Sequence, residues 1–442
     1  MTEAKNEKGQ AGKILLGLAL GAIAGVAANT LFGSAAWLRW VVEKITQPAG
    51  QMWLRALIMI VVPLIFASLS LGVSGLGDIR KVGRIGLKTL LLFALGTALA
   101  ATIGLVLVNL VRPGANLPAE TKDQLLAQFS GDASKLAEAV GPMKLGVEML
   151  VNIVPRNPVA AAAQGEMLAL IFFSLLFGAA LGILPAERAR PMLGFLEALA
   201  DIVVVIIGWV MKLAPIGVFA LIFSVTALFG YDILQKLLLY VLTVLTGLAI
   251  HFIVVYSLLV RFLARMNPLE FLARIKTIVV TAFSTSSSNA TLPTTMAVSE
   301  RELGLPKEIS GFVLPLGATM NMHGTALFEG VTVLFIAQVF GVALPLSAQV
   351  IVILMSVVMA IGTAGVPSGS IPLLMIVLGV VGLPPEAIAL VLGVDRILDM
   401  CRTTLNVTGD VATAVVVARS EGYDLEAARL ALAEGKSLSA AD

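Results

Sequence analysis

Charged and amide side chains recur at helical spacing along residues 391–410 (VLGVDRILDMCRTTLNVTGD). Asp395, Asp399, Arg402, Asn406 and Asp410 fall within about 80° of one face of an α-helix at this spacing. The residues around them are largely apolar, and an ionisable group inside a bilayer costs about 2.5–3.5 kcal/mol on insertion scales. This polar stripe predicts a binding site for a charged solute; a structural ion-pair stripe against neighbouring helices is the alternative.

The composition places this stripe in a membrane protein. Of the 442 residues, 58% are hydrophobic and 13% are charged, and the mean hydropathy is +0.97, which is far above the range of soluble proteins. Because lipid gives the backbone no hydrogen-bond partners, the apolar runs are predicted to be transmembrane helices, at about 14–38, 53–76, 89–111, 167–185, 193–225 and 234–262. The net charge of +2 gives no indication of nucleic-acid binding, and we expect none.

Two polar stretches interrupt the apolar pattern further along the chain. Residues 283–293 read FSTSSSNATLP, and the uncharged run 330–385 is broken by GTAGVPSGS at 362–370. Irregular backbone at membrane depth is tolerated only where it is buried in protein or lines a cavity. We therefore predict two helical hairpins whose tips meet at a site, with ordinary loops outside the membrane as the alternative.

A third polar stretch, GATMNMHGTALFEG at 317–330, has the composition of a helix that is broken partway across the membrane. Asn321, His323 and Thr325 lie there among three glycines, and unwound carbonyls at such a break can coordinate cations. A continuous helix with a buried, hydrogen-bonded His323 is the alternative. The other histidine, His251, stands alone in an apolar span and is predicted to be a core residue.

Four motifs in order, SSS (286–288), NMHGT (321–325), GTAGVP (362–367) and LDMCRTTLNVTGD (398–410), resemble the glutamate transporter family, the dicarboxylate/amino acid:cation symporters. The resemblance implies one all-α polytopic membrane unit over residues 1–442, with eight transmembrane helices, two re-entrant hairpins (about 265–299 and 345–380) and a homotrimeric assembly in contact with membrane lipid. It further implies an elevator motion of a transport part (about 77–112 and 229–420) against a scaffold (about 13–76 and 113–228). The expected location is the inner membrane, with both termini cytoplasmic.

The same resemblance implies roles for individual residues. Asp399 would accept the substrate α-amino group, and Arg402 would bind a side-chain carboxylate; the remaining substrate-binding residues would be Ser287, Ser288, Thr325, Val366, Thr403 and Asn406. One sodium site would use Asp410 and Asn406 with the backbone of Gly317 and Asn321, and a second would use Thr319 with the carbonyls of Ile361 and Thr363. A guanidinium and an aspartate one turn apart suit an acidic amino acid, because each binds one of its charged groups.

The coupling ion is where this sequence departs from the family pattern. Sodium-coupled members have NMDGT, and its aspartate helps bind a further sodium together with hydroxyl groups on the third span. Here that position is His323, with Phe93 and Gly96 standing where a tyrosine and a threonine would help and Thr97 as the remaining hydroxyl. A histidine supplies no anionic oxygen, whereas an imidazolium, whose unperturbed pKa is about 6.5, could replace the missing cation.

We therefore expect this sodium site to be absent and transport to be coupled to protons or only weakly dependent on sodium. A neutral His323 that packs beside two intact sodium sites is the alternative. No organic cofactor is expected. Competing functions are a sodium-coupled acidic amino acid or C4-dicarboxylate symporter, an ion channel, and an intramembrane serine hydrolase built from Ser286–Ser288 and His323. The hydrolase fits no nucleophile elbow, and an arginine and aspartate stripe has no role in its chemistry.

Overall fold

A computed structural model describes residues 2–33, 35–74, 79–117, 154–164, 166–363 and 365–433. Within these residues all regular structure is helical. The N-terminal helices are α1 (Thr2–Phe32), α2 (Ala36–Val41), η1 (Val42–Thr46), α3 (Gln47–Ile58), α4 (Val61–Ser74), α5 (Ile79–Val111), α9 (Pro158–Gln164), α10 (Met167–Ile183), α11 (Ala186–Lys212) and α12 (Ala214–Phe229). Most of the connection predicted between residues 112 and 166 lies outside the described residues.

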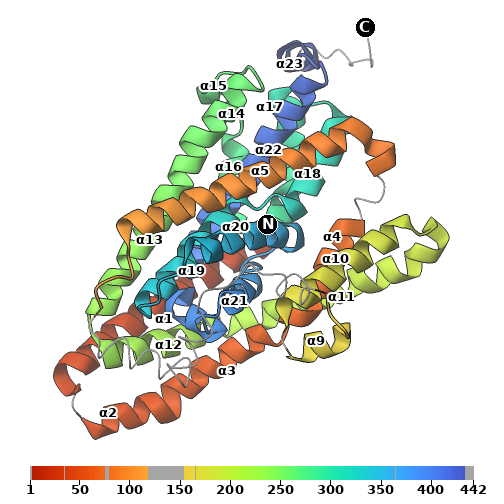
Figure 1. Cartoon of the computed structure of the whole chain (residues 1–442). Coiled ribbons are helices and arrows are strands. Elements are labelled where there is room, and N and C mark those ends of the chain that lie inside the picture. Colours follow the sequence, from red (N-terminus) through yellow and green to blue (C-terminus); the bar gives the residue numbers. More distant parts are fainter. Residues whose placement is uncertain are drawn as a thin grey trace.

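The C-terminal half contains the polar motifs. Its helices are α13 (Asp232–Ile250), η3 (His251–Val255), α14 (Tyr256–Phe262), α15 (Pro268–Arg274), α16 (Lys276–Thr285), α17 (Ser288–Leu303), α18 (Lys307–Met320), α19 (His323–Val339), α20 (Leu346–Gly362), α21 (Ile371–Val380), η4 (Pro385–Ile388), α22 (Ala389–Ser420) and α23 (Leu425–Ala433). Figure 1 shows α23 and α2 at opposite ends of the molecule.

Among the described residues, six helical runs are long and apolar enough to cross a membrane. They are Gly12–Phe32, Ala36–Leu71, Arg84–Val111, Ala186–Lys212, Ile233–Phe262 and Lys307–Val339. Shorter apolar helices cover Ala169–Ile183, Ala214–Leu228, Leu346–Ile361 and Ile371–Val380. The prediction of an all-α polytopic membrane protein is confirmed at this level.

One predicted span is wrong as a single helix. The run 193–225 is divided at Leu213, where α11 ends and α12 begins. Pro215 lies in the first turn of α12. Proline has no backbone N–H and is tolerated at the start of a helix but not in its interior, so a largely apolar run need not be one helix. Hydropathy alone reports the length of the run and misses this break.

The predicted break in the helix at NMHGT is confirmed. Helix α18 ends at Met320, and α19 begins at His323. Between them Asn321 (φ −108°, ψ 83°) and Met322 (φ −113°, ψ 55°) have non-helical backbone angles. The residues of α19 are buried almost throughout, as expected for a helix that is surrounded by protein rather than lipid.

Two helix–turn–helix pairs carry the other polar motifs. Helices α16 and α17 are joined at Ser286 and Ser287, and Ser286 has a left-handed backbone (φ 50°). Helices α20 and α21 are joined by the described residues 363 and 365–370. The helices α16, α17, α18, α19 and α20 pack around α22 or around one another, whereas α1, α3, α4, α10, α11 and α12 pack chiefly among themselves. The polar stretches are thereby gathered beside α22.

Candidate functional site

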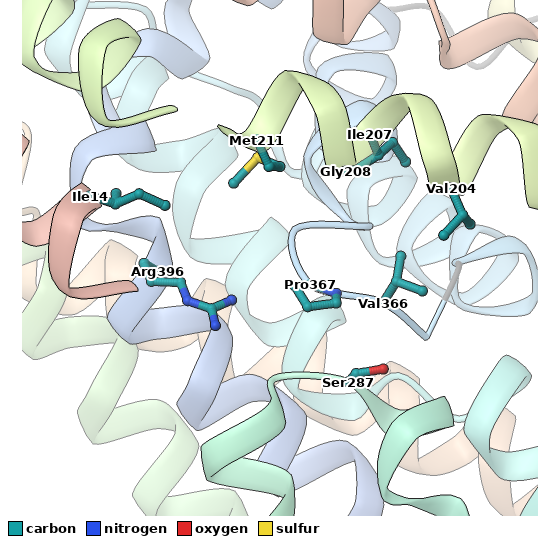
Figure 2. A pocket seen from close by; sticks show the side chains of 9 residues that line it. All are labelled: Ile14, Val204, Ile207, Gly208, Met211, Ser287, Val366, Pro367 and Arg396. Atoms are coloured by element: carbon teal, nitrogen blue, oxygen red, sulfur yellow. The ribbon is translucent and has the colours of Figure 1, made fainter. Parts of the chain in front are cut away.

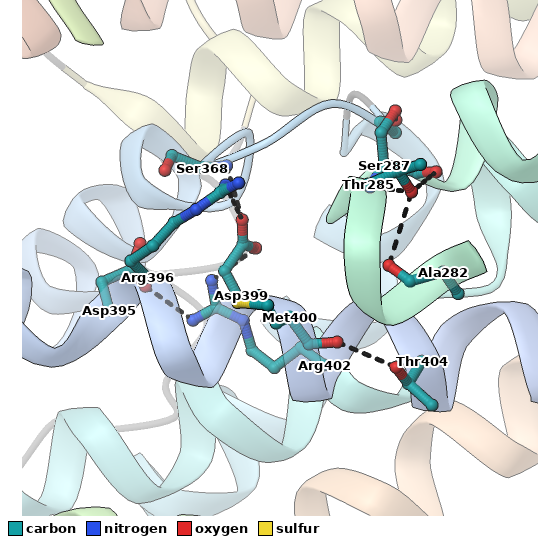
Figure 3. A network of polar contacts seen from close by, with 11 residues as sticks. Ala282, Thr285, Ser287, Ser368, Asp395, Arg396, Asp399, Met400, Arg402 and Thr404 are labelled. Atoms are coloured by element: carbon teal, nitrogen blue, oxygen red, sulfur yellow. Dashed lines mark hydrogen bonds and ion pairs between the residues drawn. The ribbon is translucent and has the colours of Figure 1, made fainter. Parts of the chain in front are cut away.

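The polar stripe of α22 is buried and internally paired. Arg402, only 1% exposed, donates from Nη1 to Asp395 Oδ1 and from Nη2 to Asp399 Oδ1, each at 2.9 Å. Its guanidinium carbon lies 3.8 Å from the centre of the Phe328 ring on α19. Figure 3 shows Arg402 between the two carboxylates. These ion pairs lie within α22 rather than against neighbouring helices, so the residues predicted to bind a solute are paired with one another in this state.

A small cavity lies where the two helix turns, the start of α19 and α22 converge. Its volume is about 20 Å³, and its lining residues are Ser286, Ser288, Met322, Thr325, Thr363, Gly365, Val366, Ser370, Asp399, Thr403 and Asn406. Six of the eight residues expected to bind substrate are therefore brought together. Ser287 and Arg402 do not line this cavity, since Arg402 is turned towards Asp395.

Ser287 instead ties the two turns to each other. Its hydroxyl donates to the Gly365 carbonyl at 2.6 Å, and the Asn289 amide donates to the same oxygen at 3.1 Å. A Cβ atom at Gly365 would lie 2.7 Å from the Ala318 carbonyl, so only glycine allows this close approach to α18. The joined turns separate the small cavity from a larger one.

The larger cavity, of about 280 Å³, lies between the turns and α11 (Figure 2). Val204, Ile207, Gly208 and Met211 of α11 form one wall, with Ile14 beside them, and Ser287, Val366, Pro367 and Arg396 line the remainder. Arg396 is buried, and its Nη1 lies 3.8 Å from Asp399 Oδ2. Val366 lines both cavities, so it stands in the wall between them.

The residues expected at the first sodium site lie together. Asn321 Nδ2 donates to Asp410 Oδ1 at 2.8 Å, and a Cβ at Gly317 would lie 2.5 Å from that same oxygen. Asn321 Oδ1 is buried without a hydrogen-bond partner in the described part of the chain. A carboxylate and an unpaired amide oxygen are the ligands a hard cation prefers, so these residues fit sodium. Asn406 Oδ1 accepts a hydrogen bond from the Gly324 amide at 2.7 Å and is engaged elsewhere.

The residues expected at the second sodium site are more loosely arranged. The Thr363 hydroxyl is buried and donates to the Met359 carbonyl at 2.9 Å. The exposed Thr319 hydroxyl donates to the Leu316 carbonyl at 3.0 Å, within its own helix. Ile361 is half-buried. The contact between Gly365 and the Ala318 carbonyl brings this turn beside α18, next to Thr319.

His323 lies in a separate cluster of polar side chains. Its Nδ1 is 2.8 Å from the Tyr256 hydroxyl, which is itself 2.9 Å from the Leu405 carbonyl. The hydroxyl has a single proton, so it either donates to the Leu405 carbonyl and accepts from Nδ1–H, or donates to Nδ1. The backbone carbonyl of Phe93 on α5 also interacts with the imidazole, although Nε2 makes no hydrogen bond of standard geometry in the described part of the chain.

Gly96 of α5 makes room for the imidazole. A Cβ atom at this position would lie 2.3 Å from Nε2 and 2.4 Å from Cε1 of His323. The His323 ring therefore packs against Gly96 of the third predicted span. Thr97 donates its hydroxyl proton to the Phe93 carbonyl at 2.7 Å. The space that a threonine side chain would fill is occupied by the histidine ring.

Replacing Gly96 with alanine is expected to displace the His323 ring and break its bond to Tyr256. Overpacking of this kind costs about 1–3 kcal/mol, so the thermal transition of the purified protein should fall. Gly194→Ala on α11 is the matched control, because no atom lies within 4 Å of a Cβ there. An unchanged thermal transition in Gly96→Ala would contradict the described contact.

Sequence reasoning missed several residues of this region. His251 is not alone in its span: its ring centre lies 5.3 Å from that of His323 and 5.0 Å from that of Tyr256. Glu329, one turn after Thr325, is fully buried, and its carboxylate faces the Ser356 hydroxyl, with Arg402 as a further polar neighbour. A carboxylate at the start of a long uncharged run was a usable signal for Glu329. No comparable signal marked His251 as a neighbour of His323.

Comparison with known proteins agrees with these features. A family model described as the sodium:dicarboxylate symporter family matches residues 11–420. The chain is 37% identical over 417 residues to the proton/sodium-glutamate symport protein of Bacillus subtilis (strain 168), covering 94% of this chain and 93% of that protein. It is 36% identical over 383 residues to the proton/glutamate-aspartate symporter of Escherichia coli (strain K12), covering 86% of each. It is also 33% identical over 395 residues to the C4-dicarboxylate transport protein of Bacillus subtilis (strain 168), covering 89% of this chain and 92% of that protein.

The matched regions include the broken helix, both helix turns and the stripe of α22. The family and the relatives named are symporters and other transporters rather than enzymes, so the hydrolase alternative is wrong. The resemblance found in the four motifs is confirmed. The chain belongs to the sodium:dicarboxylate symporter family.

Proposed function

We propose that this protein is a secondary active transporter of acidic amino acids, with L-glutamate and L-aspartate as substrates. The observation that carries the proposal is the cavity lined by Asp399, Thr403 and Asn406, with the buried Arg402 against Asp399. Arg402 binds a substrate carboxylate in place of Asp395 or Asp399, and Asp399 binds the ammonium group. The ammonium group and the side-chain carboxylate of the substrate thus each take over one end of an existing ion pair. Thr403 and Asn406, which line the cavity, hold the amino and α-carboxylate ends.

The other proposed substrate contacts come from residues that line the small cavity or join the two helix turns. Ser288, Thr325 and Val366 line the cavity, and Ser287 acts at the joined turns. A cavity of about 20 Å³ is only large enough for a water molecule. Substrate entry therefore requires the turns to separate, and the larger cavity beside Arg396 is the space into which they open.

A C4-dicarboxylate is the second candidate substrate. One relative is named a C4-dicarboxylate transport protein, and the guanidinium of Arg396 lies near Asp399 in addition to that of Arg402. An amino acid fits better, because a dianion without an amine would leave Asp399 without a new cationic partner.

Counterflow in proteoliposomes tests whether the protein is a carrier and whether it prefers amino acids to dicarboxylates. Labelled glutamate should accumulate transiently against unlabelled internal glutamate or aspartate, which a pore does not support. Unlabelled aspartate should compete strongly, and succinate should compete weakly. Counterflow with succinate but not with glutamate would replace the first substrate assignment with the second.

The proposed architecture is that of an elevator carrier. It has eight transmembrane helices, with α16–α17 and α20–α21 as re-entrant hairpins, and assembles as a homotrimer in the inner membrane. The scaffold comprises residues of about 13–76 and 113–228, and the transport part comprises about 77–112 and 229–420. The separate packing of α1, α3, α4, α10, α11 and α12 supports this division.

The proposed orientation places both termini in the cytoplasm. Basic residues gather at the end of the molecule that carries α23. Arg84 and Lys88 form ion pairs with Glu421, and Arg274 pairs with Glu426 at 2.8 Å. An excess of lysine and arginine marks the cytoplasmic side of a membrane protein, so this end supports the assignment.

For the coupling ion, we propose that the sodium site involving the third span is absent and that protons drive transport. The imidazole of His323 fills the space at Gly96. His251 on η3 and Tyr256 on α14 pack against the ring, and Gly409, the neighbour of Asp410 on α22, approaches it closely. Asp410 and Asn321 remain available for one sodium ion, so a weak sodium dependence is compatible with the proposal.

His323→Gln is expected to flatten the pH dependence of glutamate uptake between about pH 5 and 8, because glutamine cannot titrate in this range. Glu329→Gln is the matched variant, since Glu329 is the other buried titratable group on α19. The experiment measures initial uptake rates at a series of pH values in proteoliposomes. If only Glu329→Gln flattens the profile, Glu329 carries the proton and His323 is a fixed substitute for a cation.

A further inference from the structure

The second helix turn closes directly onto the carboxylate that is proposed to bind the substrate amine. The backbone N–H of Ser368 donates to Asp399 Oδ2 at 3.0 Å, while Arg402 occupies Oδ1. Figure 3 shows Ser368 and Arg402 on opposite sides of this carboxylate. Ser368 is 2% exposed, so water does not compete freely for the bond. In this state each carboxylate oxygen of Asp399 already accepts one hydrogen bond.

We propose that Ser368 is a positioning residue whose amide takes the place of the substrate amine on Asp399 in the empty carrier. The identity of the competing amine rests on the proposed function. The closed turn itself does not depend on it. The amide and the ammonium compete for Oδ2, so substrate binding releases the turn from Asp399. A substrate without an amine would displace the amide and leave that oxygen without a hydrogen-bond donor, with only the Arg396 guanidinium 3.8 Å away, which adds to the selection for amino acids.

The backbone of Ser368 makes this closed turn easy to open. Its φ of +59° is left-handed, a conformation that L-residues other than asparagine and aspartate rarely adopt. The Ser368 hydroxyl is buried without a hydrogen-bond partner in the described residues, so the side chain does not offset this strain. The turn is held by backbone bonds, from the Gly369 amide to the Val366 carbonyl at 3.1 Å and from the Ile371 amide to the Ser368 carbonyl at 3.2 Å.

Glycine adopts this backbone conformation without strain, so Ser368→Gly should shift the empty carrier towards the closed turn by about three- to tenfold. Two measured changes follow. Amide hydrogen exchange of the segment 365–372 in substrate-free protein should slow by about that factor, relative to the intrinsic rate of each sequence. The apparent glutamate affinity should weaken by a similar factor, because a smaller fraction of the carrier is open to bind it.

Asn116→Gly is the matched control. Asn116 also has a left-handed backbone, with φ +62°, but it is exposed and lies outside both turns. This variant should leave hydrogen exchange at 365–372 and glutamate affinity unchanged. A second variant removes the acceptor: Asp399→Ala should speed exchange of the same segment, because Ser368 then has no carboxylate to bind.

The hydrogen-exchange measurement needs no substrate, so it separates this inference from the proposed function. Slower exchange in Ser368→Gly and faster exchange in Asp399→Ala support the closed turn, even if the protein were to bind no glutamate. Unchanged or faster exchange in Ser368→Gly would overturn the inference, as would unchanged exchange in Asp399→Ala. Tighter glutamate binding in Ser368→Gly would overturn the competition between amide and amine.

Discussion

Replacing Arg402 with cysteine is expected to lower glutamate and aspartate uptake by at least about 30-fold. Loss of a buried, hydrogen-bonded charge partner costs about 2–5 kcal/mol, and Arg402 is the guanidinium that bonds both Asp395 and Asp399. A cysteine leaves a neutral space where the substrate side-chain carboxylate would bind. Serine or alanine uptake should appear or increase in this variant, because a neutral side chain no longer leaves a cation unpaired.

Folding has to be separated from selectivity in this experiment, since the substitution leaves two buried carboxylates without their shared partner. Size-exclusion profiles of the purified variant report folding. Arg402→Lys keeps the charge but loses the bidentate geometry, so it should retain weak acidic amino acid uptake and gain no neutral uptake. Unchanged glutamate affinity in well-folded Arg402→Cys would contradict the role of Arg402.

Asp399→Asn is expected to weaken binding of glutamate and aspartate by about 10- to 100-fold and to spare dicarboxylates that lack the amine. The asparagine retains an oxygen that can accept a hydrogen bond but loses the negative charge, and charge-assisted hydrogen bonds are roughly twice as strong as neutral ones. Competition against labelled glutamate, with aspartate and succinate as inhibitors, measures the two effects together.

Asp395→Asn is the matched control for this variant. Asp395 also bonds Arg402 and lies one turn earlier on α22, but it does not line the small cavity. The control should therefore affect amino acids and dicarboxylates alike. Equal losses for both substrate classes in Asp399→Asn would count against an amine-binding role.

The stripe on α22 was predictable because residue spacing fixes which side chains share a helix face. The five residues are all buried on one uninterrupted helix, as predicted. The break at NMHGT was predictable because glycine and polar residues in an apolar run oppose a continuous buried helix. Both predictions depend on local sequence alone.

Contacts between distant segments were not predictable in the same way. Helical spacing places Arg402 beside Asp399 and Asp395 on one face of α22, but it could not tell that Ser287 bonds Gly365 rather than lining the small cavity. The proximity of His251 to His323 arises from the packing of α13, which η3 continues, against α19, which hydropathy does not report. The amide of Ser368 was unpredictable for a further reason, since a backbone donor leaves no mark in the residue type.

The most direct test of the proposed transport mechanism is uptake of labelled glutamate into proteoliposomes with the sodium and proton gradients imposed separately. We expect an inward proton gradient to drive accumulation when sodium is replaced by choline on both sides. A sodium gradient at uniform pH should add little. Complete loss of accumulation in choline, with accumulation restored by a sodium gradient alone, would contradict the proton-coupled account of the His323 site.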